Sequence, residues 1–136
     1  MKISHPRFPS LAAAVRAGIQ LVPDPAPPRR YFGVSADTGR LGCDALAAAW
    51  FAEYFDVERI SEDEPHAGLA RYLSSPLAEA YPVLKRDVGP SCPLGAHERC
   101  PRPEGGRTVE SKVIHLEDEH GYKREAIAEW LQSHGF

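Results

Sequence analysis

The residues of this chain that are best suited to chemistry are two cysteines and three histidines in its last third. Cys92, His97 and Cys100 lie within nine residues of one another. His115 and His120 follow on a segment with helical periodicity. Zinc prefers thiolate sulfur and imidazole nitrogen, and a structural zinc site usually holds its ion with four such ligands in a tetrahedron. The order of these residues, loop first and helix second, therefore predicts a metal site.

The spacing of the two downstream histidines restricts how they could share one ion. At about 100° per residue, His115 and His120 point about 140° apart on a regular helix. Both can bind the same ion only if the helix unwinds near His120, which the following Gly121 would permit. Otherwise a single helix histidine would join the three ligand candidates of the loop.

The pattern predicts one structural zinc ion that fastens the loop to the helix. The predicted ligands are Cys92, Cys100, His120 and either His97 or His115. In the alternative interpretation no metal is bound. The cysteines are then free thiols, His120 packs on the core and His115 is solvated.

No catalytic motif accompanies these residues. The zinc metalloprotease motif places two histidines four residues apart on one helix face, whereas here they are five apart. The chain has neither a phosphate-binding glycine loop nor a nucleophile elbow. Glu117 and Asp118 are expected to be solvated, and Cys43 is expected to lie in the core. No catalytic residue is predicted, although an enzyme that depends on a metal or a Cys–His centre stays an alternative.

The candidate ligands of the loop lie in an irregular segment, residues 87–107. It contains four prolines and four glycines, which leave its backbone no regular way to pair with itself. A structureless segment of about 20 residues is unusual inside a domain and is commonly functional, fastened or disordered. A bound zinc ion would attach this segment to the following helix.

Helix signals occur on both sides of this loop. Ser10 is an N-cap for a helix that Pro23 must end, and an alanine-rich helix is expected from about Cys43 to Phe55. Two short helices are expected to begin near residues 61 and 75. Thr108 and Gly121 bound the next helix, and a last helix runs from about residue 123 to residue 133.

These segments predict an all-α fold, a single compact domain of five to six short helices with a long Pro/Gly-rich loop. Residues 1–9 form a loose N-terminus and residues 10–136 the domain. The alternative is an α+β fold with a small hairpin near residues 31–42. Helical periodicity predicts the following core: Leu46, Trp50, Tyr54, Val113, Leu116, Ile127, Trp130 and Leu131.

Composition excludes several classes of protein. The 136 residues carry a formal net charge of −3, so there is no chain-wide basic field for nucleic acid. Basic pairs such as Lys123–Arg124 are expected on a solvated face, and a DNA-binding regulator that uses helix 122–133 is an alternative. No apolar run approaches the length of a membrane span, and no signal peptide is recognisable. With three cysteines, an odd number, we expect thiols or metal ligands in the cytoplasm.

Two segments resemble those of small uncharacterised bacterial and phage-associated proteins. In that family a helix rich in isoleucine ends in a leucine–asparagine–aspartate–x–histidine run, and a basic–acidic pair and an isoleucine–alanine–x–tryptophan helix follow. Residues 113–131 are similar to this pattern, with Glu117 in place of asparagine, and residues 42–49 are similar to another helix of the family. Members often carry a close cysteine pair, whereas Cys92 and Cys100 are further apart. The resemblance implies a helical fold and carries no established activity.

The function expected from these observations is that of a small intracellular interaction or regulatory module, stabilised by one zinc ion. Its expected partner is another protein. A nucleic acid is a less favoured partner that stays an alternative, and no membrane is expected to bind it.

Overall fold

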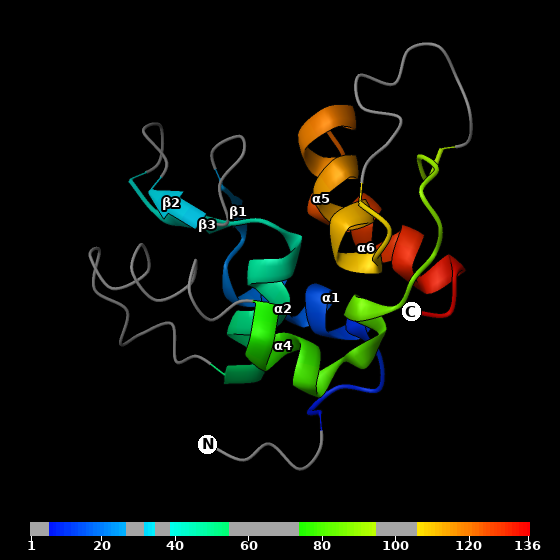
Figure 1. The fold of residues 1–136 in the computed structure, drawn as a ribbon. Helices are drawn as coiled ribbons and strands as arrows, with labels where there is room; N and C mark the ends of the chain where they lie inside the picture. Colours follow the sequence, from blue (N-terminus) through cyan, green and yellow to red (C-terminus); the bar gives the residue numbers. More distant parts are fainter. Residues whose placement is uncertain (1–5, 27–31, 35–38, 55–73, 95–105) are drawn as a thin grey trace.

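The computed structural model describes residues 6–26, 32–34, 39–54, 74–94 and 106–136 of the chain. The predicted helical fold is confirmed: this part of the chain is mostly α-helix (Figure 1). Its helices are α1 (Leu11–Leu21), α2 (Ala45–Tyr54), α4 (Ser74–Ala80), α5 (Val109–His120) and α6 (Arg124–Ser133), with a 3-10 turn, η2 (Pro82–Lys85). The helix expected to begin near residue 61 lies outside the described residues.

A small sheet lies beside the helices. Its strands β1 (Asp24–Pro25), β2 (Phe32–Val34) and β3 (Leu41–Cys43) have the order β1-β3-β2. The antiparallel pair of β2 and β3 is the hairpin that the α+β alternative predicted. The parallel pair of β1 and β3 was not predicted, because β1 lies in a proline-rich segment and proline has no amide hydrogen to donate. A Cβ at Gly42 would lie 2.0 Å from the Pro25 carbonyl oxygen, so glycine is what permits this pairing.

The core is built around α2, which is buried from residue 45 to residue 53. Helix α1 packs closely along it, and α6 packs on α1 and α5. The contact of α1 with α2 is so close that a Cβ added at Gly18 would lie 1.8 Å from the Ala48 carbonyl oxygen. The alanines of α2 and Gly18 of α1 together allow the two backbones to approach.

Most of the predicted core is confirmed. The buried members are Leu46, Trp50, Val113, Leu116, Ile127 and Leu131. Trp130 is partly buried and packs against the core, and the side chain of Tyr54 lies outside the described residues. Cys43 is buried as predicted, but it belongs to β3 and not to the following helix.

Both predicted ends of the first helix are also present. The Ser10 hydroxyl oxygen accepts a hydrogen bond from the Ala13 amide at 3.1 Å, and α1 ends at Leu21, two residues before Pro23. The Leu11 amide donates to the Phe136 carbonyl oxygen at 2.9 Å, which satisfies another of the free amides at the start of α1. The segment after α6 is thereby joined to the start of α1.

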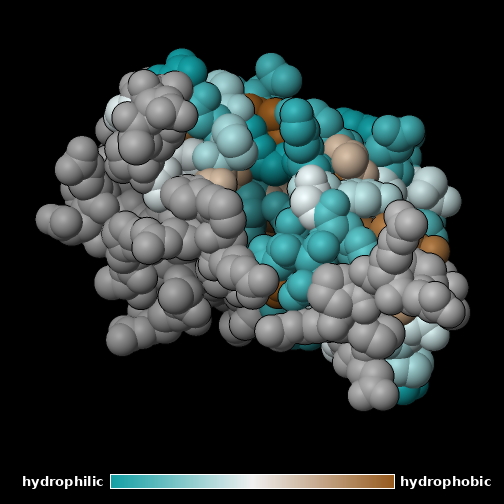
Figure 2. All heavy atoms as spheres, turned by 90° about the horizontal axis from the view of Figure 1, so that it is seen from above, coloured by the Kyte–Doolittle hydropathy of each residue, from teal (hydrophilic) through white to brown (hydrophobic). Residues whose placement is uncertain are grey.

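The described surface offers few apolar residues. Figure 2 shows a mainly hydrophilic face in which hydrophobic residues form small, separate spots. The large hydrophobic side chains exposed in the described part are those of Leu21, Val88 and Leu94. None of the helices described here has both the length and the hydrophobicity to cross a bilayer.

Replacing Gly18 with alanine tests the contact between α1 and α2. An alanine inside a helix normally stabilises it by about 1 kcal/mol relative to glycine. Because the added methyl would collide with the backbone of Ala48, we expect Gly18→Ala to lower the free energy of unfolding by about 1–3 kcal/mol instead. Urea denaturation followed by circular dichroism measures the difference.

Gln20→Ala is the control, since Gln20 is exposed on the same helix and should change stability by less than about 0.5 kcal/mol. A Gly18→Ala variant as stable as the parent protein would contradict the packing described above.

Candidate metal centre

Helix α5 carries the two histidines of the candidate site and is held at both ends. The Thr108 hydroxyl oxygen accepts from the Ser111 amide at 3.2 Å, and the Ser111 hydroxyl oxygen accepts from the Thr108 amide at 3.0 Å. This capping box confirms Thr108 as the predicted N-cap. At the other end Gly121 has the left-handed conformation, φ 66°, of the predicted C-cap.

The loop that brings Cys92 to this helix is closed by backbone pairing at its two ends. Asp87 and Thr108 form an antiparallel bridge. The Val88 amide donates to the Arg107 carbonyl oxygen at 2.7 Å. No backbone pairing was expected within residues 87–107, and for the ends of the segment this expectation was wrong. Proline and glycine are absent from the residues that form the bridge, so these backbones are free to pair.

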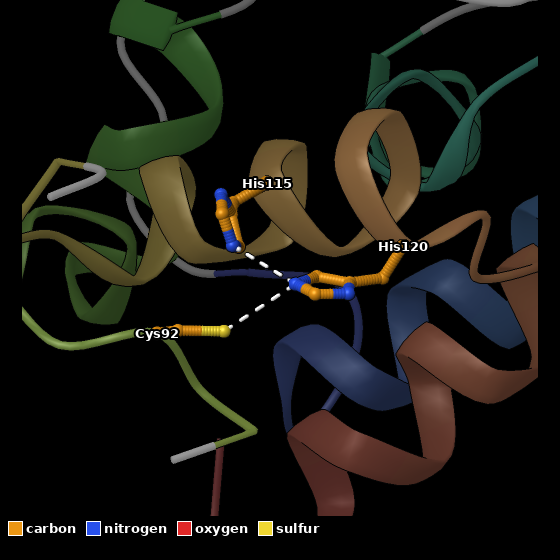
Figure 3. A group of neighbouring side chains, drawn as sticks. All are labelled: Cys92, His115 and His120. Atoms are coloured by element: carbon orange, nitrogen blue, oxygen red, sulfur yellow. Dashed lines mark hydrogen bonds between the residues drawn. The ribbon is translucent and has the colours of Figure 1, made fainter. Parts of the chain in front are cut away.

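Cys92 is the buried residue of an otherwise exposed stretch. From residue 85 to residue 94 it is the one side chain that is buried. Figure 3 shows that its thiol points towards His120 at the end of α5. The buried side chain of this stretch therefore meets the helix through a polar contact.

Cys92, His115 and His120 converge on one point. The distance from Cys92 Sγ to His120 Nε2 is 3.4 Å, and the distance from His120 Nε2 to His115 Nε2 is 3.1 Å. One donor atom from each of the three side chains lies within 4.8 Å of the other two. In Figure 3 both interactions meet at Nε2 of His120, which lies between the other two groups.

These separations fit a metal ion of the size of zinc. Bonds of about 2.0–2.1 Å to nitrogen and 2.3 Å to sulfur, at tetrahedral angles, place two ligand atoms about 3.3–3.6 Å apart. The two measured distances of 3.4 and 3.1 Å lie within a few tenths of an ångström of this range. Two of the three pairs of donor atoms thus lie close to the separation of zinc ligands, and the third pair lies within 4.8 Å.

The structure brings His115 and His120 together although the helix remains helical through His120. The Gly121 amide donates to the Leu116 carbonyl oxygen, five residues back, so that the last turn is wider than a regular α-helical turn. The prediction that the helix must unwind to unite these histidines was wrong, because α5 stays helical through His120 while the two Nε2 atoms lie 3.1 Å apart.

The metal-free interpretation placed His120 on the core and His115 in solvent, whereas the structure shows His115 to be the more buried of the two. His115 is 6% exposed and His120 is partly exposed. The other two predicted ligands, His97 and Cys100, lie outside the described residues. Their participation stays a prediction.

Lys112 is a buried neighbour of the centre that was not predicted from the sequence. It is 3% exposed, and its ammonium nitrogen is buried without a hydrogen-bond partner among the described residues. Burial lowers the pKa of Lys112, while the nearby Cys92 thiol acts to raise it. A signal was present in the sequence: Lys112 stands three residues after Val109 and four before Leu116, on the apolar stripe of α5.

A second polar cluster lies where α5 meets the start of α2. The Asp44 carboxylate accepts from the Ala47 amide at 2.8 Å, and the Glu117 carboxylate accepts from the Ala45 amide at 3.3 Å. Both acids therefore cap α2 at the positive end of its dipole. Burial raises the pKa of Glu117 to about 7, and burial and the adjacent Glu117 raise the pKa of Asp44 well above its usual value.

Glu117 was expected to be solvated, and the structure shows this expectation to be wrong. Its oxygen Oε1 is buried without a hydrogen-bond partner. A carboxyl group with a pKa near 7 is suited to acid–base chemistry only where it can reach a substrate proton. Since Oε1 is enclosed by protein, the cap on α2 is the role that the geometry supports.

Arg124 was also expected on a solvated face and is instead 4% exposed. Its guanidinium donates to the carbonyl oxygens of Val22, at 2.5 Å, and Pro23. Its Nη1 also lies 3.6 Å from the Cys43 sulfur. Burial raises the pKa of Cys43 to about 12, which keeps this thiol protonated and unreactive. Arg124 thus connects α6 to the end of α1 and is not presented to an external phosphate.

Comparisons with protein-family models, with curated proteins and with solved structures find no match to the chain.

Glu117→Gln tests the charge on the cap of α2. Because the folded state holds the proton of Glu117 up to about pH 7 and the unfolded state releases it near pH 4.5, stability should fall as the pH rises between these values. Glutamine keeps the oxygen that accepts from Ala45 and cannot ionise. We expect the variant to gain on the order of 1–3 kcal/mol in unfolding free energy at pH 8 and little at pH 4.5.

Chemical denaturation at a series of pH values provides the measurement. The exposed Glu125→Gln serves as the control and should leave the pH profile unchanged. If Glu117→Gln shifts stability equally at all pH values, ionisation of Glu117 is not the cause.

Proposed function

We propose that this chain is a zinc-binding protein whose centre is formed by Cys92, His115 and His120. The observation that carries the proposal is the convergence of one sulfur and two nitrogen atoms, 3.4 and 3.1 Å apart, between a loop and a helix. Two of these side chains are buried, and the donor atoms of all three face one another. Such an arrangement is costly unless the groups satisfy one another or share an ion.

The ligand types favour zinc over other metals. Calcium and magnesium take oxygen ligands, and none of the three residues supplies one. One thiolate and two imidazoles in a tetrahedral arrangement suit zinc, which has no geometric preference of its own.

The proposed role of the ion is to hold the loop onto the core. Val88 and Leu94 leave their side chains exposed, so hydrophobic burial contributes little to docking this segment. Bonds from zinc to Cys92 and to the histidines of α5 would hold the segment in place of hydrophobic contacts. The zinc-stabilised domain would then act by contact with another protein, as the sequence predicts.

The DNA-binding alternative has less support, since Arg124 is engaged with backbone carbonyl oxygens. The exposed residues of α6 include Glu125 and Glu129, whose charges repel phosphate.

Metal analysis of the purified protein tests the proposal. We expect about one zinc ion per chain in protein prepared without chelators. Cys92→Ser and His120→Ala should each remove the ion, because each deletes one of the converging donor atoms. Each should also lower the melting temperature by about 5 °C or more.

Cys43→Ser is the matched control, because Cys43 is an equally buried thiol that belongs to a different cluster. It should keep its zinc. Parent protein that contains no transition metal, and takes up none when zinc is added, would refute the proposal.

Zinc content should also depend on pH. Thiolate and imidazole bind metal only when deprotonated, so occupancy should fall as the pH drops below about 6. Equilibrium dialysis against zinc at pH 5 to 8 measures this. Occupancy that stays constant over the whole range would contradict ligation by Cys92 and the histidines.

A further inference from the structure

The buried side chain of Lys112 lies close to the proposed centre. Lys112 stands three residues before His115, and its ammonium nitrogen is buried with no hydrogen bond in the part of the chain that the structure describes. The acidic groups in its electrostatic environment are the Cys92 thiol and the Asp87 carboxyl. Asp87 already forms an exposed ion pair with Arg107, at 2.9 Å. A buried ammonium without an opposite charge is strongly disfavoured. An anion beside Lys112 would therefore stabilise its charged form.

Binding of zinc would increase the need for a negative charge at this site. The ion carries two positive charges, the Cys92 thiolate neutralises one, and the two imidazoles are neutral when they bind metal. Together with Lys112, the centre would then hold two uncompensated positive charges away from water. A neutral fourth ligand, such as an imidazole, would leave both in place.

We propose that the fourth ligand of the zinc is an anion and that Lys112 is the side chain that pairs with it. This inference rests on the zinc centre proposed above. The ligand chemistry is that of a single negative charge that binds zinc and accepts a hydrogen bond from an ammonium group: a thiolate or a small carboxylate. A thiolate would come from Cys100 of the same chain, whereas a carboxylate would come from solution. The imidazole of His97 brings no charge and would not meet this requirement.

Cobalt(II) provides the test, since it replaces zinc and its visible absorption reports the number of thiolates and the identity of the remaining ligands. Lys112→Met keeps the length of the side chain and removes the charge. We expect it to weaken cobalt binding at least tenfold in competition with a chelator, whereas Lys112→Arg should bind nearly as well as the parent. Lys123→Met, which removes the same charge from an exposed position, should have no effect.

The stability of the metal-free variants separates this role from a structural one. Removing an unpaired buried charge should leave metal-free Lys112→Met at least as stable as the metal-free parent. A loss of cobalt affinity in a variant that is equally or more stable cannot arise from unfolding.

The source of the anion follows from two further measurements on the cobalt protein. If the anion is a thiolate, Cys100→Ser will lose about half of the sulfur-to-cobalt charge-transfer absorption, and added acetate will change nothing. If it is a free carboxylate, Cys100→Ser will match the parent. Acetate will then shift the cobalt bands saturably, with at least tenfold weaker binding in Lys112→Met.

Two results would overturn the inference while leaving the zinc centre intact. One is unchanged cobalt affinity in Lys112→Met. The other is loss of the metal in His97→Ala, which would identify a neutral fourth ligand. Failure of the parent protein to bind cobalt or zinc would instead refute the centre itself, and this inference with it.

Discussion

The approach of two helix backbones at Gly18 determines where the polar groups of this protein can lie. With no side chain at this position, α1 lies directly on α2, and α2 becomes buried along almost its whole length. A helix enclosed in this way needs its free amides satisfied by protein groups, because water does not reach them. Glu117 supplies one of these contacts from α5. The position of α5, and with it the direction of His115 and His120, therefore follows from how α2 is enclosed.

The local features of this fold could be predicted from the sequence, and the tertiary ones could not. Ser10, Thr108 and Gly121 act within one turn of their helices, so residue type alone identifies them. The strand at Asp24 and Pro25 depends on a partner 18 residues away and on the absence of a side chain at Gly42. Such a close approach has no local signal.

The candidate site could likewise be predicted from the sequence only in part. Residue type and order were enough to single out Cys92, His115 and His120. The geometry that unites them depends on the last turn of α5 and on the path of the loop, which spacing along the chain does not contain. Lys112 and Glu117 are long charged residues on an apolar stripe, and general experience with surface residues favours exposure. Only the packing of α5 on its neighbours shows that Lys112 and the Oε1 atom of Glu117 are buried.

The buried charged residues differ in how they are satisfied. Arg124 has carbonyl acceptors in the ordinary backbone, so its burial is explained by the fold alone. Glu117 binds one amide and avoids the cost of charge by holding its proton up to about pH 7. Lys112 has no hydrogen-bond acceptor among the described residues, and burial lowers its pKa.

The bridge between Asp87 and Thr108 has a consequence for the thermodynamics of the loop. A free chain that must bring a thiol to two histidines loses much conformational entropy on closing. Here the ends of the loop are already joined, and Cys92 lies only five residues beyond the bridge. The thiol is thus presented to the histidines at a high effective concentration. Any ion that binds all three side chains must in turn stabilise the hydrogen bond between Val88 and Arg107, since the two closures share one short segment of chain.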